Sequence, residues 1–168
     1  MEGITMKGHV DSFLVSPDGE RTLVQPGPNT VSYACADVVA GLFAGRGGGP
    51  ARIVFAYSAS TKQESKFNFT AQSRAQKRKD IVKSGLSASG VAIDANPSLA
   101  PSTAGGEYAG NVVQLRATMM APTGDDVYVY GYLLEDAEGR VLATRKLSSG
   151  LLKPAGYGLA VTWSITFL

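Results

Sequence analysis

The chain has 168 residues, of which 44% are hydrophobic and 18% are charged, so it is long enough to bury a core without disulfides or metals. Its 20 glycines and 8 prolines indicate many turns and favour one β-dominated domain spanning 1–168. The formal net charge of +2 lacks the strong basic excess of a nucleic-acid-binding protein, so we expect no nucleic-acid partner.

Cys35 is the single cysteine, which excludes an internal disulfide and any multi-cysteine metal site. The stretch Met1–Lys7 has no basic region followed by an apolar run, so we expect no signal peptide. No run of about 18 apolar residues is present to span a membrane. These features predict a protein made in a reducing cytoplasm, with no membrane partner.

Strand-like alternation opens the chain. It predicts strands over 6–16 and 20–25, joined by a turn at Pro17-Asp18-Gly19, because proline and glycine supply the backbone angles of a tight turn. The spacing then changes, and it predicts one amphipathic helix over about 30–44. The apolar face of this helix comprises Val31, Cys35, Val38, Val39 and Leu42.

Asn29 is the predicted N-cap of this helix, and Gly45 is its predicted stop. Gly47-Gly48-Gly49 follows the helix, which favours a connector over a phosphate-binding loop, because such loops open a helix after a strand. A strand is predicted over 52–57, where Ile53, Phe55 and Tyr57 share one face.

The middle of the chain holds two long polar segments. Residues at about 58–83 form a predicted extended arm or loop, and residues at about 94–107 form a predicted Pro/Gly-rich loop. A short strand near 81–93 is predicted between them. Loops of this length usually carry function or become ordered on a partner.

The pattern in the last third of the chain predicts a meander of strands. Alternation predicts strands over 112–119, 127–135, 141–147 and 157–168, which we expect to form four consecutive antiparallel strands of one sheet. About eight strands in total predict a mainly β fold, an antiparallel β-sandwich or jelly roll with one helix and long loops.

Few residues are arranged for chemistry. His9 and Asp11 lie two apart on a predicted strand, as an acid–base pair or simply as part of a solvated strand face. One histidine and one cysteine do not supply the three or four ligands of a zinc site. We therefore predict no catalytic, cofactor-binding or metal-binding residues, and a protein that is not an enzyme.

A cluster of basic residues is the first candidate interface. It comprises Arg74, Lys77, Arg78 and Lys79, with Lys83 nearby. The cluster is either a solvated loop or a surface that docks on an acidic protein, where paired charges set register and partner choice. The salt dependence of binding distinguishes the two.

Three tyrosines are the second candidate interface. Tyr128, Tyr130 and Tyr132 alternate with Val127, Val129 and Leu133, which predicts a tyrosine stripe on one face of a strand. Such a stripe suits a half-wet subunit interface, or it packs inside the sandwich. Glycan stacking is a third reading, although no acidic or amide groups accompany the stripe.

Several segments resemble small virion proteins of tailed bacteriophages. They are Gly27-Pro28-Asn29-Thr30-Val31, Ala40-Gly41-Leu42-Phe43-Ala44-Gly45, the strand 52–57, Tyr108-Ala109-Gly110-Asn111-Val112-Val113, and Leu159-Ala160-Val161-Thr162-Trp163-Ser164-Ile165. The nearest kind is the capsid decoration, or cement, protein. In many relatives a short Gly-rich turn follows the strand after the helix, whereas here Ser58-Ala59-Ser60-Thr61 leads into the basic segment.

This resemblance implies a virion protein made in the host bacterial cytoplasm. Its partners would be the major capsid protein, whose neighbouring subunits it stabilises on the outer head shell, and itself, as a dimer or trimer. It implies no cofactor. The alternatives are a tail or baseplate/fibre-attachment structural protein and, less favoured, a glycan-binding module.

Overall fold

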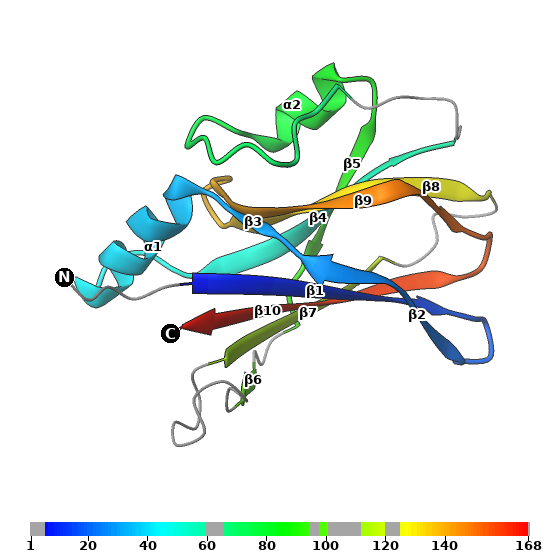
Figure 1. Ribbon diagram of the computed structural model, residues 1–168, viewed down its shortest axis with the longest axis horizontal. Coiled ribbons are helices and arrows are strands. Elements are labelled where there is room, and N and C mark those ends of the chain that lie inside the picture. Colours follow the sequence, from blue (N-terminus) through cyan, green and yellow to red (C-terminus); the bar gives the residue numbers. More distant parts are fainter. Residues whose placement is uncertain (1–5, 60–65, 95–97, 101–111, 120–124, 168) are drawn as a thin grey trace.

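The computed structural model describes residues 6–59, 66–94, 98–100, 112–119 and 125–167 (Figure 1). The elements in chain order are β1 (Met6–Val15), β2 (Arg21–Pro28), β3 (Thr30–Val31), α1 (Tyr33–Phe43), β4 (Pro50–Ser58), α2 (Arg78–Lys83), β5 (Ser87–Ala92), β6 (Ser98–Ala100), β7 (Val112–Met119), β8 (Val127–Asp136), β9 (Val141–Lys153) and β10 (Gly158–Phe167).

These ten strands form two five-stranded antiparallel sheets that face each other. Sheet A has the order β2-β1-β10-β7-β6, and sheet B has the order β3-β9-β8-β4-β5. Figure 1 shows sheet B between sheet A and the short helix α2. The predicted mainly β fold is confirmed as a β-sandwich of two antiparallel sheets, with ten strands in the described ranges in place of about eight.

The main hydrophobic core lies between the two sheets. Trp163 of β10 is fully buried there, and Phe55 and Tyr132 of sheet B meet edge to face with their ring centroids 5.4 Å apart. The hydroxyl groups of Tyr132 and Ser12, which lie in opposite sheets, are 2.8 Å apart and form a buried hydrogen bond. This bond satisfies two polar groups that burial would otherwise leave unpaired.

The C-terminal strand β10 is held on both sides. It pairs with β1 and β7, and Trp163 lies opposite Val10 on one side and Leu115 on the other. The apolar alternation of this segment therefore marks a central strand of sheet A. The predicted hairpin is also present, as β1 paired with β2.

The predicted four-strand meander is wrong. The chain crosses from sheet A to sheet B between β7 and β8, and it returns to sheet A between β9 and β10. Alternation identifies which side chains of a strand are buried, but it carries no information about the neighbouring strand. In a sandwich both sheets bury one face, so the four strands read alike in sequence.

Helix α1 is confirmed but starts later than expected. Thr30 and Val31 form β3, which pairs with β9, and Ser32, not Asn29, is the N-cap residue. The helix buries Ala34, Cys35 and Val38, whereas Leu42, predicted on the apolar face, is 46% exposed. Gly45 adopts a φ of +70° just after the helix, as predicted for its stop.

Residues 66–86 cover the outer face of sheet B, where they form a second, smaller core. Phe67, Phe69 and Ile81 are buried there against strands β4 and β8. Of the predicted extended arm or loop at about 58–83, residues 66–77 form a loop that packs on the sheet and does not extend as an arm, and residues 78–83 form α2, which was not predicted. Residues 60–65 lie outside the described part.

The predicted strand near 81–93 is present as β5, but Ile81 belongs to α2. Within the predicted loop at 94–107, Ser98–Ala100 forms β6 and pairs with β7, while residues 95–97 and 101–107 lie outside the described part. Neither helix is long and apolar enough to cross a membrane, among the residues that the structure places.

Candidate functional site

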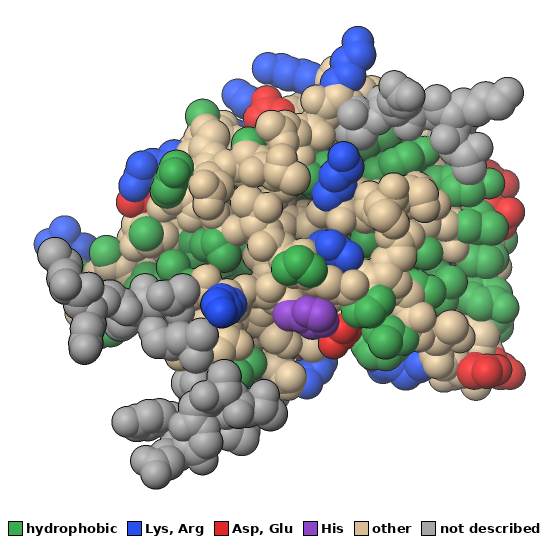
Figure 2. Space-filling model, in the orientation of Figure 1, with side chains coloured by type: hydrophobic (Ala, Val, Ile, Leu, Met, Phe, Trp, Pro, Cys, Tyr) green, Lys and Arg blue, Asp and Glu red, His purple; other side chains and the backbone are tan. Residues whose placement is uncertain are grey.

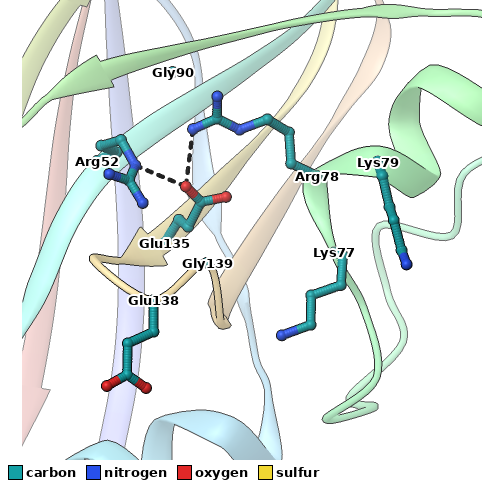
Figure 3. Close-up of a pocket in the computed structure, with 8 residues that line it drawn as sticks. All are labelled: Arg52, Lys77, Arg78, Lys79, Gly90, Glu135, Glu138 and Gly139. Carbon is teal, nitrogen blue, oxygen red and sulfur yellow. Dashed lines mark hydrogen bonds and ion pairs between the residues drawn. The ribbon is translucent and has the colours of Figure 1, made fainter.

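A surface cleft of about 580 Å³ lies where α2 begins, against the outer face of sheet B. We name it the basic cleft (Figure 3). Its lining residues come from β4, the start of α2, β5 and the end of β8 with its following turn; they are Arg52, Lys77, Arg78, Lys79, Gly90, Glu135, Glu138 and Gly139. Three of the four predicted basic residues are thus brought together, with an arginine that the sequence analysis did not single out.

A buried carboxylate organises the basic cleft. Glu135 is 2% exposed, and one of its oxygens, Oε1, accepts hydrogen bonds from Arg52 Nε at 2.7 Å and Arg78 Nη2 at 2.8 Å. Arg52 also donates to the carbonyl oxygen of Asp136, at 2.8 Å. In Figure 3 the two guanidinium groups converge on this one carboxylate. Charge-assisted bonds of this kind hold both arginines in place.

The local structure of α2 presents the lysines of the cleft. The backbone N–H of Lys77 donates to Asp80 Oδ2 at 2.9 Å, which satisfies a donor at the start of the helix. Ile81 anchors the helix in the second core. Arg78, three residues before Ile81, lies on the same side of the helix as Ile81, and Lys77 and Lys79 on either side of it also line the cleft.

The basic cleft carries excess positive charge. Four cations and two carboxylates line it, which leaves a formal charge of +2. The ammonium groups of Lys77 and Lys79 form no ion pair with any carboxylate in the described ranges. Figure 2 shows Lys and Arg side chains gathered at the surface around α2. The cleft therefore offers two cations to an incoming anion.

Arg74, the fourth predicted basic residue, lies elsewhere. It donates from Nε to Asp37 Oδ2 of α1 at 2.8 Å and from Nη2 to Oδ1 at 3.3 Å, and its guanidinium lies 5.5 Å from the ring centre of Tyr33. The hydrogen bond from Arg74 lowers the pKa of Asp37. Arg74 thus connects the segment before α2 to α1 and does not line the basic cleft.

The three tyrosines do not form one stripe. The pairing of β8 with its neighbours shifts around Tyr130, between Val129 and Gly131, and this bulge changes which residues face the core. Tyr132 points into the main core, whereas Tyr130 packs against the second core on the opposite face. The side chain of Tyr132 is fully buried and does not reach the surface, so for this residue the packing interpretation holds.

Burial has electrostatic consequences for the tyrosines and the cysteine. It raises the pKa of Tyr132 to about 12, against the lowering effect of the bond to Ser12. It also raises the pKa of Tyr130, with a smaller contribution from Tyr128. The pKa of the Cys35 thiol is raised by desolvation as well, which keeps the thiol protonated and unreactive at neutral pH.

Two further candidates lie outside the basic cleft. His9 Nε2 and Asp11 Oδ1 are 2.9 Å apart on β1, in a half-exposed pair that matches a solvated strand face. Gly47 adopts a φ of +70° in the connector after α1. No group of three or more His, Cys, Asp or Glu side chains is placed to hold a metal ion within the described residues.

Arg52 and Glu135 are not among the residues predicted from the sequence. The signal was present, because Glu135 is an acidic residue in the otherwise apolar run 127–135. A buried carboxylate requires a cation, and the register places Arg52 directly opposite Glu135 on β4. Comparison of the chain with protein-family models finds no match, and comparisons with curated proteins and with solved structures find none either.

Proposed function

We propose that this protein is a non-enzymatic structural protein of a tailed-bacteriophage virion, a decoration protein that binds neighbouring major capsid subunits on the outer head shell. The observation that supports a binding role is the basic cleft. Its arginines are fixed by Glu135, while Lys77 and Lys79 have no described carboxylate partner. The virion assignment rests on the sequence resemblance.

The geometry favours an acidic protein surface as the partner. Complementary charges steer association and fix the register of two surfaces, more than they add raw affinity. A single cleft of this size gives a modest contact. Repetition of the same contact over a symmetric shell multiplies it, because each bound copy is held beside further identical sites.

The test is reconstitution with heads that lack the protein. Purified protein is expected to co-sediment with expanded heads in hundreds of copies, as the shell symmetry allows. It is also expected to raise the resistance of the heads to heat and to low salt. Heads that neither bind the protein nor gain stability contradict the proposal, and about three to a dozen copies per virion place the protein in the tail instead.

A further inference from the structure

Strand β5, beside the basic cleft, is an edge strand of sheet B. Among the strands that the structure describes, it pairs with β4 alone and ends the strand order of the sheet. Its sequence, Ser-Ala-Ser-Gly-Val-Ala, contains no charged residue and no proline. Edge strands are usually protected by charges, prolines, bulges or short length, because their unpaired backbone groups recruit other strands.

The other edges of the two sheets show such protection. β2 contains Pro26 and Pro28 and pairs with β1 through an irregular register. β3 has two residues and β6 has three. Only β5 combines six residues, regular pairing and small neutral side chains, among the edges that the structure describes.

The free side of β5 offers hydrogen bonds. Six residues span about 20 Å, and alternate residues direct their N–H and C=O groups away from β4. The described backbone bonds near β5 belong to its flanks: Leu86 donates to Ile81, Ile93 to Ala51, and Asp94 to Arg116. Apart from the pairing with β4, residues 87–92 donate no described backbone hydrogen bond.

The basic cleft opens onto this edge at Gly90. Arg78 lies over Gly90, so a positive charge stands on the outer face of β5 at the middle of the strand. On this face β5 presents Ala88 and Gly90, whereas Val91 faces the main core. A strand added beside β5 would therefore place alternate side chains near the cations of the cleft and the others near apolar surface.

We propose that an extended acidic segment of the partner protein adds to sheet B as a strand beside β5, with its carboxylates directed to Arg78 and the positive charge of the basic cleft. This inference rests on the proposed function and specifies its binding mode, which is strand addition. A second copy of this chain is disfavoured as the occupant, because pairing β5 with β5 would bring two basic clefts together.

The test uses three short peptides and the full chain. The first alternates valine and glutamate, the second has lysine in place of glutamate, and the third has the first sequence with alternate backbone nitrogens methylated. NMR chemical shifts and amide hydrogen exchange of residues 87–92 report binding at β5. The first peptide is expected to bind with a Kd below about 1 mM and to slow exchange of the outward amides of β5.

The other two peptides separate charge from strand pairing. Both are expected to bind at least about tenfold more weakly than the first peptide. The lysine peptide is repelled by the cations of the cleft, and the methylated peptide lacks the backbone N–H donors that pair with β5. The inference of strand addition is overturned if binding requires Lys77 and Lys79, leaves the signals of β5 unchanged and tolerates backbone methylation. In that case the proposed role of the basic cleft still stands. No binding by the first peptide at about 1 mM overturns the inference, whereas the proposed function is judged separately by binding to heads.

Discussion

The guanidinium of Arg78 lies over Gly90, so close that a Cβ atom on Gly90 would be 2.3 Å from Nη2 and 2.8 Å from Cζ. The missing side chain at Gly90 therefore lets Arg78 reach across β5 to Glu135 (Figure 3). A glycine in the middle of a strand weakens the strand, which makes this contact a specific reason for its presence.

Gly90→Ala is expected to displace Arg78 from Glu135 and to lower the free energy of unfolding by about 1.5 kcal/mol, the low end for one hydrogen bond to a charged group. In an Arg78→Ala background the same change is expected to be neutral or slightly stabilising, since alanine suits a strand better than glycine. Urea unfolding of the four proteins measures this coupling. Equal effects in both backgrounds contradict the contact, and Gly49→Ala, with open space around it, is the control.

Glu135→Gln removes the charge that both Arg52 and Arg78 contact. We expect the free energy of unfolding to fall by about 2–3 kcal/mol, near the low end for a broken buried ion pair, because solvent reaches both arginines. The matched control is Glu138→Gln at a 71% exposed side chain of the same cleft, with an expected change below about 0.5 kcal/mol. Similar losses for the two variants in urea unfolding would refute the central role of Glu135.

Tyr132→Phe tests the buried hydroxyl. At neutral pH we expect a loss of about 1–2 kcal/mol, because the Ser12 hydroxyl is left without its partner. The pKa of Tyr132 is raised to about 12, above the unfolded value of about 10. The stability that the buried, protonated phenol contributes is therefore fully present below about pH 10 and is lost as the pH rises through about 12.

The stability difference between wild type and Tyr132→Phe is therefore expected to shrink or reverse over this interval, by up to about 3 kcal/mol. Guanidinium unfolding at a series of alkaline pH values measures it. Ser12→Ala keeps the buried phenol and so is expected to retain the alkaline loss. If the free energies of unfolding of Tyr132→Phe and wild type run in parallel from pH 9 to 12, ionisation of the phenol does not destabilise the folded protein, which contradicts the raised pKa of Tyr132.

Gly131→Ala tests the packing of the second core at the bulge. A Cβ atom there would be 2.5 Å from Phe69 Cε1 and 2.6 Å from the carbonyl oxygen of Arg145. We expect a loss of about 2–3 kcal/mol from overpacking. The loss is expected to persist in a Phe69→Leu background, since the carbonyl cannot move aside, and Gly48→Ala is the control, with no atom close by. Calorimetric melting of these variants gives the result.

Alternation predicted most strands, because each buries one face in the core, but it did not predict their partners or the bulge in β8. The bulge made the predicted orientation of Tyr132 wrong. A single extra residue moves it from the face of Tyr130 to the core, and no pattern of residues in β8 encodes this shift.

The candidate site was predicted only in part. Lys77, Arg78 and Lys79 are adjacent in sequence, so charge clustering identified them, and it grouped Arg74 with them although Arg74 contacts α1. Helix α2 has six residues, too few for a helical periodicity to show in sequence, and its packing on sheet B orders it. Arg52 and Glu135 meet only through the register of β4 with β8.

The most direct test of the account is charge reversal at the rim of the basic cleft. Lys77→Glu with Lys79→Glu is compared with Lys83→Glu with Lys146→Glu, which has the same net charge but lies outside the cleft. We predict that the first pair weakens binding to heads lacking the protein at least about tenfold and that added salt weakens wild-type binding. Equal binding by wild type and both double variants, unaffected by salt, would contradict the account.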